Sequence, residues 1–266
     1  MGRVKQNKKS TFIDMTAMSD VTVLLLTFFM LTSTFLAKEP FQATVPPSVS
    51  EEEMPMTNVV EILVNPQGKV WLTMNNDTTQ KASNAKMRVS MLKHMSQIYR
   101  AQTGKSVSFN SEDSIAFAKL GAFGVPFQDL PKFLQSSPDE QDAWLTGKEE
   151  ANGKITGIPI SEQTEAQKDV IRKSKNQKGL DEFQMWIEAA VRAAADLKNT
   201  LSDKEKELVD KGELITLEKN IKEGRGFALK GDQNSPFKTI HMVMDNMQTI
   251  GRNKFTLVTA LKTEKE

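Results

Sequence analysis

The hydrophobic pattern begins with one long apolar run near the N-terminus. Residues 21–37 carry no charge, and the run extends back to residue 12 if Asp14 and Asp20 are included. A hydrocarbon core about 30 Å thick needs roughly 20 helical residues. A span of that length must start before residue 21, which would place Asp20 inside the membrane and Asp14 at its surface. The pattern therefore predicts a transmembrane helix over residues 12–37.

The charges on either side of this run predict its orientation. Four basic residues precede it: Arg3, Lys5, Lys8 and Lys9. Only Lys38 follows it closely, so the positive-inside bias places residues 1–11 in the cytoplasm and the chain after residue 38 outside. A cleaved signal peptide is the competing interpretation. We disfavour it because the apolar core is long, contains Asp20 and ends in Phe35-Leu36-Ala37 rather than in a small-x-small cleavage site.

Asp20 is the main candidate functional residue. An aspartate near the centre of a membrane helix costs about 2.5–3.5 kcal/mol on insertion scales, so such acids usually face a partner or a wet path. At about 100° per residue, Thr16, Thr27 and Thr34 lie within about 40° of Asp20 and form a polar stripe with it. Desolvation raises the pKa of a carboxylic acid, so an acid that alternates between dry and wet surroundings can bind and release a proton. The pattern predicts that Asp20 relays protons while the threonines line the path or pack against another helix.

Simpler interpretations of the same residues remain open. Asp20 can lie at the lipid headgroups, and the threonine hydroxyls can merely satisfy backbone carbonyl groups. One helix does not enclose a path by itself, so a proton relay also requires walls supplied by another polypeptide.

After the apolar run the pattern changes to strands and shorter helices. Residues 38–57 are rich in proline and glutamate and predict an extended linker. Val59–Val64 and Lys69–Thr73, separated by a four-residue turn, predict a β-hairpin. Apolar residues at helical intervals predict a helix over Ala85–Arg100.

The C-terminal half predicts one further helix and a closing strand–helix–strand unit. Leu180–Leu197 has an apolar face opposite its charges, and the Trp and Phe of that face are expected to be core residues. Phe227–Lys230 and Phe255–Ala260 predict strands. Between them, Ser235-Pro236 suits the N-cap and first position of a helix that Gly251 ends. Together the elements predict a small α/β domain with one layer of helices on one layer of strands.

Composition narrows the classes of function. The 35 basic and 34 acidic residues leave a formal net charge of +1, so no nucleic-acid partner is expected. The absence of cysteine excludes disulfides and thiolate metal sites. His94 and His241 lie far apart in sequence, so they are expected to be satisfied or exposed rather than metal ligands. Asp232 lies among turn-forming residues. No hydrolase, Walker or paired-carboxylate motif is present in the sequence, so we expect neither an enzyme nor a metal or organic cofactor.

The segment around Asp20 resembles a known family. Its motif is Ile13–Val21, IDMTAMSDV, followed by Leu24-Leu25-Leu26 and Phe28-Phe29-Met30. This motif is similar to that of the ExbD/TolR family, the proton-channel subunits of inner-membrane motors. The family's intramembrane aspartate aligns with Asp20 and its preceding threonine with Thr16, whereas Ala17 stands where most relatives carry proline. The resemblance covers residues 12–75 and resumes over residues 224–261.

This resemblance implies an architecture for the whole chain. It implies a single N-terminal transmembrane helix and a small two-layer α/β periplasmic domain over residues 58–266. Residues 101–222 would then be a long, largely helical or irregular insertion in that domain. The chain would be a single-pass protein of the bacterial inner membrane, in contact with the lipid bilayer.

The resemblance also implies partners and a role. The partners would be an ExbB/TolQ-like multi-helix ring subunit, a second copy of this chain or a paralogue, and a TonB- or TolA-like protein that crosses the periplasm. Proton flow would energise transport or other work at the outer membrane, with H⁺ as the coupling ion. A second hypothesis is a bitopic scaffold whose exported domain binds cell wall or envelope proteins, with Asp20 only assembling helices. A flagellar-stator-like subunit would also use a buried aspartate, but the chain shows no match to the exported domain of such subunits.

Overall fold

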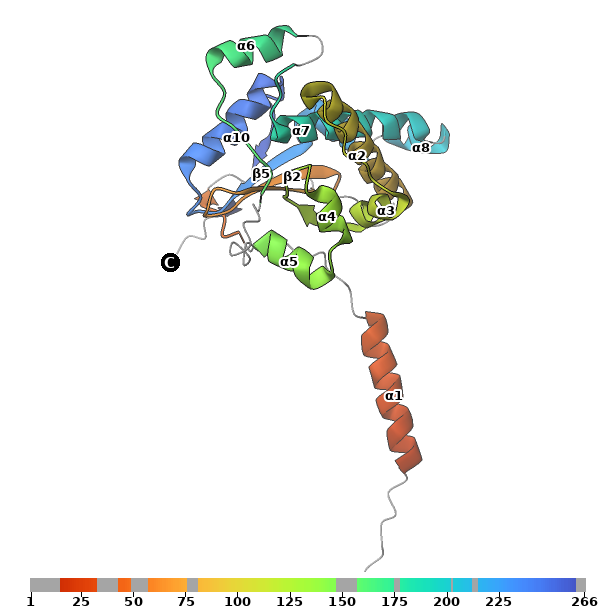
Figure 1. Cartoon of the computed structure of the whole chain (residues 1–266). Helices are drawn as coiled ribbons and strands as arrows, with labels where there is room; N and C mark the ends of the chain where they lie inside the picture. The colour runs from red at the N-terminus through yellow and green to blue at the C-terminus, as the bar shows by residue number, and fades with distance from the viewer. Residues whose placement is uncertain are drawn as a thin grey trace, which may run out of the picture. The chain divides into compact units, whose positions relative to one another are not determined.

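The computed structural model describes residues 15–32, 43–48, 57–75, 81–146, 157–174, 178–201, 203–211 and 215–261. The chain divides into two units, Met1–Ala37 and Lys38–Glu266, and each is described here by itself. The helices are α1 (Met15–Thr32), α2 (Lys81–Thr103), α3 (Ser111–Lys119), α4 (Leu130–Gln135), α5 (Pro138–Thr146), α6 (Glu165–Lys173), α7 (Glu182–Thr200), α8 (Asp203–Asp210), α9 (Leu217–Glu223) and α10 (Phe237–Thr249) (Figure 1). The strands are β1 (Pro47–Ser48), β2 (Val59–Val64), β3 (Val70–Asn75), β4 (Ala122–Phe123), β5 (Phe227–Gly231), β6 (Thr256–Leu257) and β7 (Ala260–Leu261).

The structure corrects the predicted transmembrane helix over residues 12–37. Within the described ranges, no helix combines the length and the apolar character that crossing a membrane requires. α1 has 18 residues, which at 1.5 Å per residue is about 27 Å, against a hydrocarbon core of about 30 Å. Thr16, Ser19 and Asp20 also make its first two turns polar. The fold class that included this span is therefore wrong.

The second unit is built on a mixed sheet of five strands in the order β4-β3-β2-β5-β6. β2 pairs antiparallel with β3 and parallel with β5, and β6 pairs parallel with β5 at one edge. Every residue of β2 except Glu61 is buried. A nearly continuous apolar strand is typical of a position covered on both faces, which explains why this strand lies at the centre.

The β2–β3 hairpin forms at the predicted place because its turn residues suit the geometry. Gly68 has a φ of +72°, a conformation that costs glycine little. The Asn65 carbonyl accepts a hydrogen bond from the Gly68 N–H at 2.9 Å, and its side-chain oxygen accepts one from the Lys69 N–H at 2.8 Å. These bonds determine the register in which Val64 faces Val70.

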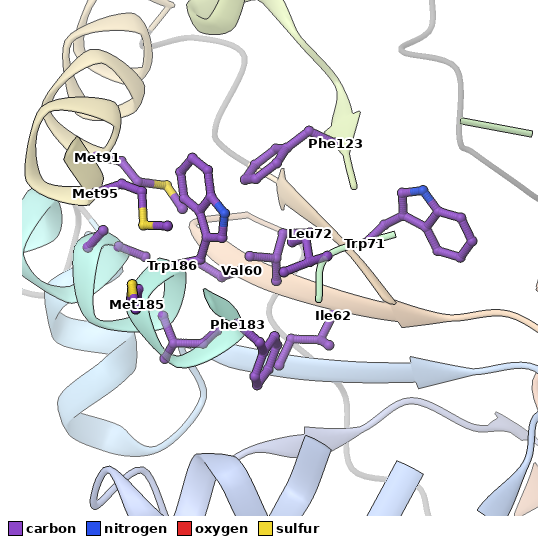
Figure 2. Packing of buried hydrophobic residues seen from close by; sticks show 14 of the residues in the cluster. Val60, Ile62, Trp71, Leu72, Met91, Met95, Phe123, Phe183, Met185 and Trp186 are labelled. Carbon is purple, nitrogen blue, oxygen red and sulfur yellow. The ribbon is translucent and has the colours of Figure 1, made fainter. Parts of the chain in front are cut away.

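The main core lies between one face of the sheet and the helices α2 and α7. Figure 2 shows Val60, Ile62 and Leu72 of the sheet on the side of Trp186 of α7 and of Met91 and Met95 of α2. Trp71 precedes Leu72 in the strand and so points to the opposite face (Figure 2). Gly124 lies against that tryptophan, since a Cβ atom there would come within 1.9 Å of the Trp71 ring.

Residues 101–222 are more than a helical or irregular insertion, because they contribute to the sheet and to the core. β4 belongs to the sheet, where Phe123 is in register with Leu72 of β3. Phe183 and Trp186 of α7 are completely buried, as the apolar stripe over Leu180–Leu197 predicted. The strands β2 and β5, which precede and follow this segment in the chain, therefore share their core with it.

The predicted C-terminal strand–helix–strand segment is present in the structure, with two differences from the prediction. α10 starts at Phe237 with Pro236 at the N-cap position, because the Ser235 hydroxyl donates instead to the Val64 carbonyl at 2.9 Å. Gly251 follows the helix with a φ of +78°, as expected for its end. The predicted strand Phe255–Ala260 is divided: β6 joins the five-stranded sheet, whereas β7 pairs in parallel with β1.

Candidate proton-relay helix

The surface of α1 is apolar and uncovered within its own unit. Its large hydrophobic side chains are each more than half exposed: Met15, Met18, Val21, Val23, Leu24, Leu25, Leu26, Phe28, Phe29, Met30 and Leu31. These side chains lie on all sides of the helix rather than on one stripe. A helix that is hydrophobic all round is stable in water only when other surfaces cover it. α1 is therefore built to be buried against something outside its own unit.

Asp20 interrupts this apolar surface and is the one charged residue of α1. Its side chain is exposed on the isolated helix. Because residues seven apart differ by about 20° around a helix and residues four apart by about 40°, Thr27 and Thr16 lie on the same side as Asp20. The structure thus brings three of the four predicted site residues onto one face, while Thr34 lies outside the described residues.

The threonine hydroxyls of α1 make local bonds. Thr27 Oγ1 donates to the Leu24 carbonyl at 2.9 Å, and Thr22 Oγ1 donates to the Ser19 carbonyl at 2.8 Å. Such bonds to the preceding turn are the alternative role considered above for these residues. They still leave the hydroxyl oxygen able to accept a hydrogen bond from a water molecule or a partner chain.

The two histidines considered in the sequence analysis, His94 and His241, differ in their neighbours. His94 Nε2 lies 2.6 Å from Asp196 Oδ2, to which the Ser90 hydroxyl also donates at 2.8 Å. His241 is exposed and its ring centroid lies 6.0 Å from that of Phe237. Among the described residues, no group of three or more metal-ligating side chains comes together.

Asp232 forms a turn, as its neighbours predicted. Its carboxylate accepts hydrogen bonds from the backbone N–H groups of Asn234 and Thr44, both at 2.9 Å. These bonds, that of Asn234 first, hold the pKa of Asp232 below its usual value. Thr44 belongs to the segment that leads to β1, so the bond from its N–H attaches that segment to the turn after β5.

Sequence reasoning missed two acids at the start of α7. Burial raises the pKa of Asp181 to about 6 and that of Glu182 to about 7. The local sequence indicates only that a helix starts here, since Asp181 and Gln184 have the spacing of a capping box. Their burial depends on residues distant in the chain and has no signature in this sequence.

Comparison with known proteins agrees with the motif around Asp20. The family model of the biopolymer transport protein ExbD/TolR matches residues 6–122. Over these residues the chain is similar to the ExbD/TolR family. The matched part includes α1, the β2–β3 hairpin and α2, and it ends at Ala122 in β4. Neither the curated proteins nor the solved structures gave a match.

The ExbD/TolR match confirms the predicted resemblance in the N-terminal part of the chain. Residues 224–261, for which we also noted a resemblance, lie outside the matched range, and that part stays a prediction. ExbD/TolR proteins form a transport-associated family without enzymatic activity, with a role in energy transduction, and they are generally anchored in the inner membrane. They work in general with partners of the ExbB/TolQ and TonB/TolA types.

Proposed function

We propose that this ExbD/TolR-like protein couples the proton motive force to work at the outer membrane, with Asp20 as the group that takes up and releases protons. The observation that carries the proposal is the surface of α1. It presents apolar side chains on all sides and a single acid, flanked by Thr16 and Thr27 on the same face. A buried carboxyl with hydroxyls beside it is suited to bind a proton in a dry environment and to release it in a wet one.

The proposal makes a second chain part of the site. In this proposal α1 is buried against an ExbB/TolQ-like subunit, whose helices supply the remaining walls of the proton path. The apolar side chains of α1 provide the contact surface and Asp20 is enclosed by it. Attachment to the inner membrane then comes through this assembly. A dimer of the chain, or a pair with a paralogue, and a TonB- or TolA-like protein complete the proposed machine.

The first experiment removes the charge of Asp20. The chain would be co-purified with the ExbB/TolQ-like protein of the same cell and placed in liposomes that contain a pH-sensitive dye. A potassium gradient with valinomycin then drives proton entry. Asp20→Asn keeps the size and the hydrogen bonding of the side chain but cannot ionise, so we expect proton flux to fall at least about tenfold. Asp20→Glu should retain part of the flux, and both variants should still assemble with the partner.

Two threonines of α1 provide a matched control. Thr27 and Thr22 make the same hydroxyl bond to the preceding turn, but Thr22 lies about 160° away from Asp20 around the helix. Thr27→Val should reduce the flux, and Thr22→Val should leave it unchanged. Normal flux in Asp20→Asn would refute the relay and would favour the scaffold hypothesis, in which Asp20 only assembles helices.

A further inference from the structure

Residues 43–48, which precede the five-stranded sheet in the chain, are bonded to the C-terminal part of the second unit. Thr44 uses both of its backbone groups for this attachment. Its N–H donates to Asp232 Oδ2 at 2.9 Å, and its carbonyl accepts the Gln233 N–H at 2.8 Å. We call residues 43–48 the strap, and its first attachment is the turn after β5.

The second attachment of the strap is the strand β7. The Pro46 carbonyl accepts the Ala260 N–H at 3.0 Å. The next two residues of the strap form β1, in which Pro47 is in parallel register with Ala260 and Ser48 with Leu261. Proline has no N–H and a fixed φ, so this part of the strap bonds through its carbonyl groups and keeps an extended course.

Asp232 connects the first attachment to the centre of the sheet. It is 7% exposed, and its Oδ1 accepts the Asn234 N–H at 2.9 Å. Its own N–H donates at 3.1 Å to the carbonyl of Val64, the last residue of β2. β2 is the central strand of the five. One residue thus receives the strap through its carboxylate and bonds to the central strand through its backbone.

The second attachment also leads to the sheet. β7 follows β6 in the chain, and Val258, which lies between them, donates its N–H to the Leu229 carbonyl of β5 at 2.9 Å. β5 in turn pairs with β2. Both attachments of the strap therefore end on the adjacent strands β2 and β5.

The order of these bonds along the chain decides where a pull from α1 acts. Among the described residues after α1, Thr44 is the first that the listed distances bond to the rest of the second unit, followed by Pro46 and β1. β2 begins only at Val59. Because the covalent chain transmits a pull in sequence order, the bonds of Thr44 meet it before β2 does.

We propose that the strap is the segment through which movement of α1 is passed to the second unit, with Asp232 as the residue that positions it. The proposal rests on the proposed function for the source of the movement, which is the uptake and release of protons at Asp20. Because both attachments end on β2 and β5, a displacement before residue 43 moves the sheet directly. Without the strap, the chain from residue 44 to residue 58 would first be drawn out, over at most about 50 Å.

Force spectroscopy of the full chain in detergent tests the strap. The chain has no cysteine, so Lys38→Cys and Lys105→Cys provide two attachment sites for the handles. Lys105 is exposed and follows α2. We expect a first event that lengthens the chain by at most about 50 Å, followed by the unfolding of the second unit.

Two substitutions at one exposed position form a matched pair. Thr44→Pro removes the N–H that Asp232 accepts, whereas Thr44→Ala keeps it. At the same force, the first event should be about tenfold faster in Thr44→Pro, as expected for the loss of a hydrogen bond to a charged group. Asp232→Ala, which removes the acceptor, should act in the same direction. Thr44→Ala should stay within about twofold of the wild type, because it changes only an exposed side chain.

The later unfolding of the second unit is the reference within each trace. It should occur at the same force in both Thr44 variants, because Thr44 lies outside the core. Equal rates of the first event in Thr44→Pro and Thr44→Ala would overturn the proposal. If a variant does not fold, the wild type decides, and a trace without a separate first event would refute the strap.

Proton flux in the liposome assay separates this proposal from the relay. Thr44→Pro should keep wild-type flux, because α1 is unchanged. Normal flux in Asp20→Asn would remove the source of the movement and overturn the proposed function, whereas the first event in the force measurement involves neither Asp20 nor the partner subunit.

Discussion

Trp186 is the centre of the aromatic packing in the second unit. Its side chain is completely buried. Its ring centroid lies 5.8 Å from that of Phe117, 4.7 Å from that of Phe123 and 5.7 Å from that of Phe127. These partners come from α3, from β4 and from the loop that Glu182 holds. A single side chain therefore connects α7 to three parts of the segment 101–222.

We expect Trp186→Ala to lower the free energy of unfolding by about 3–5 kcal/mol, because it removes buried area and leaves a cavity that rigid neighbours fill only in part. Urea denaturation monitored by circular dichroism measures the loss. Phe237→Ala is the control, since Phe237 is 77% exposed, and it should change stability by less than about 0.5 kcal/mol. Similar losses in the two variants would contradict this account of the core.

Whether the role of a residue can be predicted from the sequence depends on how far along the chain its contacts lie. The apolar stripe over Leu180–Leu197 predicted that Phe183 and Trp186 belong to the core, because that information is local to one helix. Asp20 could be singled out for the same reason, since an acid within an apolar run is visible in the chain itself. Asp181 and Glu182 could not, because their burial depends on Ser161, Phe127 and Asn246.

At the scale of elements, turns and caps explain where the helices and strands of the second unit start and end. α3, α6 and α7 each begin with a complete capping box, at Asn110, Thr164 and Asp181. Such a box satisfies two backbone N–H groups that the first turn of a helix leaves free. The ends of these helices are thus set locally, whereas their packing partners are not.

Two glycines provide a matched test of one turn. Gly68 in the β2–β3 hairpin and Gly104 after α2 both have a φ of +72°. A Cβ atom at residue 68 would lie 2.7 Å from the Thr239 hydroxyl of α10, whereas one at residue 104 would have nothing within 4 Å. Gly104→Ala should cost only the left-handed conformation, about 1 kcal/mol. Gly68→Ala should cost about 1–3 kcal/mol more, because α10 must also move.

Thermal unfolding of both variants measures this difference. The prediction fails if Gly104→Ala is as destabilising as Gly68→Ala. A third variant, with Thr239→Ala added to Gly68→Ala, should recover part of the lost stability if the contact with α10 is the cause.

At the scale of the whole molecule, the chain consists of two units that differ in how they bury apolar surface. Residues 38–266 enclose their own core between the sheet and α2, α7 and α10. α1, the described part of the first unit, leaves its apolar side chains exposed. The first unit thus depends on another surface, in agreement with the partner subunit in the proposed function.

Two deletions test this division. Removal of residues 1–37 should leave the remaining chain folded, with a melting temperature within about 3 °C of that of the full chain, since a change below 1 kcal/mol shifts Tm by only a few degrees. Removal of residues 101–222 should abolish cooperative unfolding, because it takes away β4 and α7. Calorimetry measures both. Cooperative folding of the second deletion variant would show that residues 101–222 are an independent insertion after all.

The sequence by itself determined the features that depend on neighbours along the chain. These are the helix that carries Asp20, the β2–β3 hairpin, the apolar face of α7 and the stop at Gly251, because periodicity and turn chemistry act over a few residues. The family match to residues 6–122 lies in the same part of the chain as the Asp20 motif. The predicted membrane span over residues 12–37 was wrong, since no helix among the described residues is long and apolar enough to cross a membrane.

Only the tertiary structure decided which surfaces are buried. It placed β4 in the sheet, divided the last predicted strand between β6 and β7, and partly buried Asp181 and Glu182. The physical reason is that desolvation depends on atoms brought together from distant positions, such as Ser161 and Asn246 around Asp181.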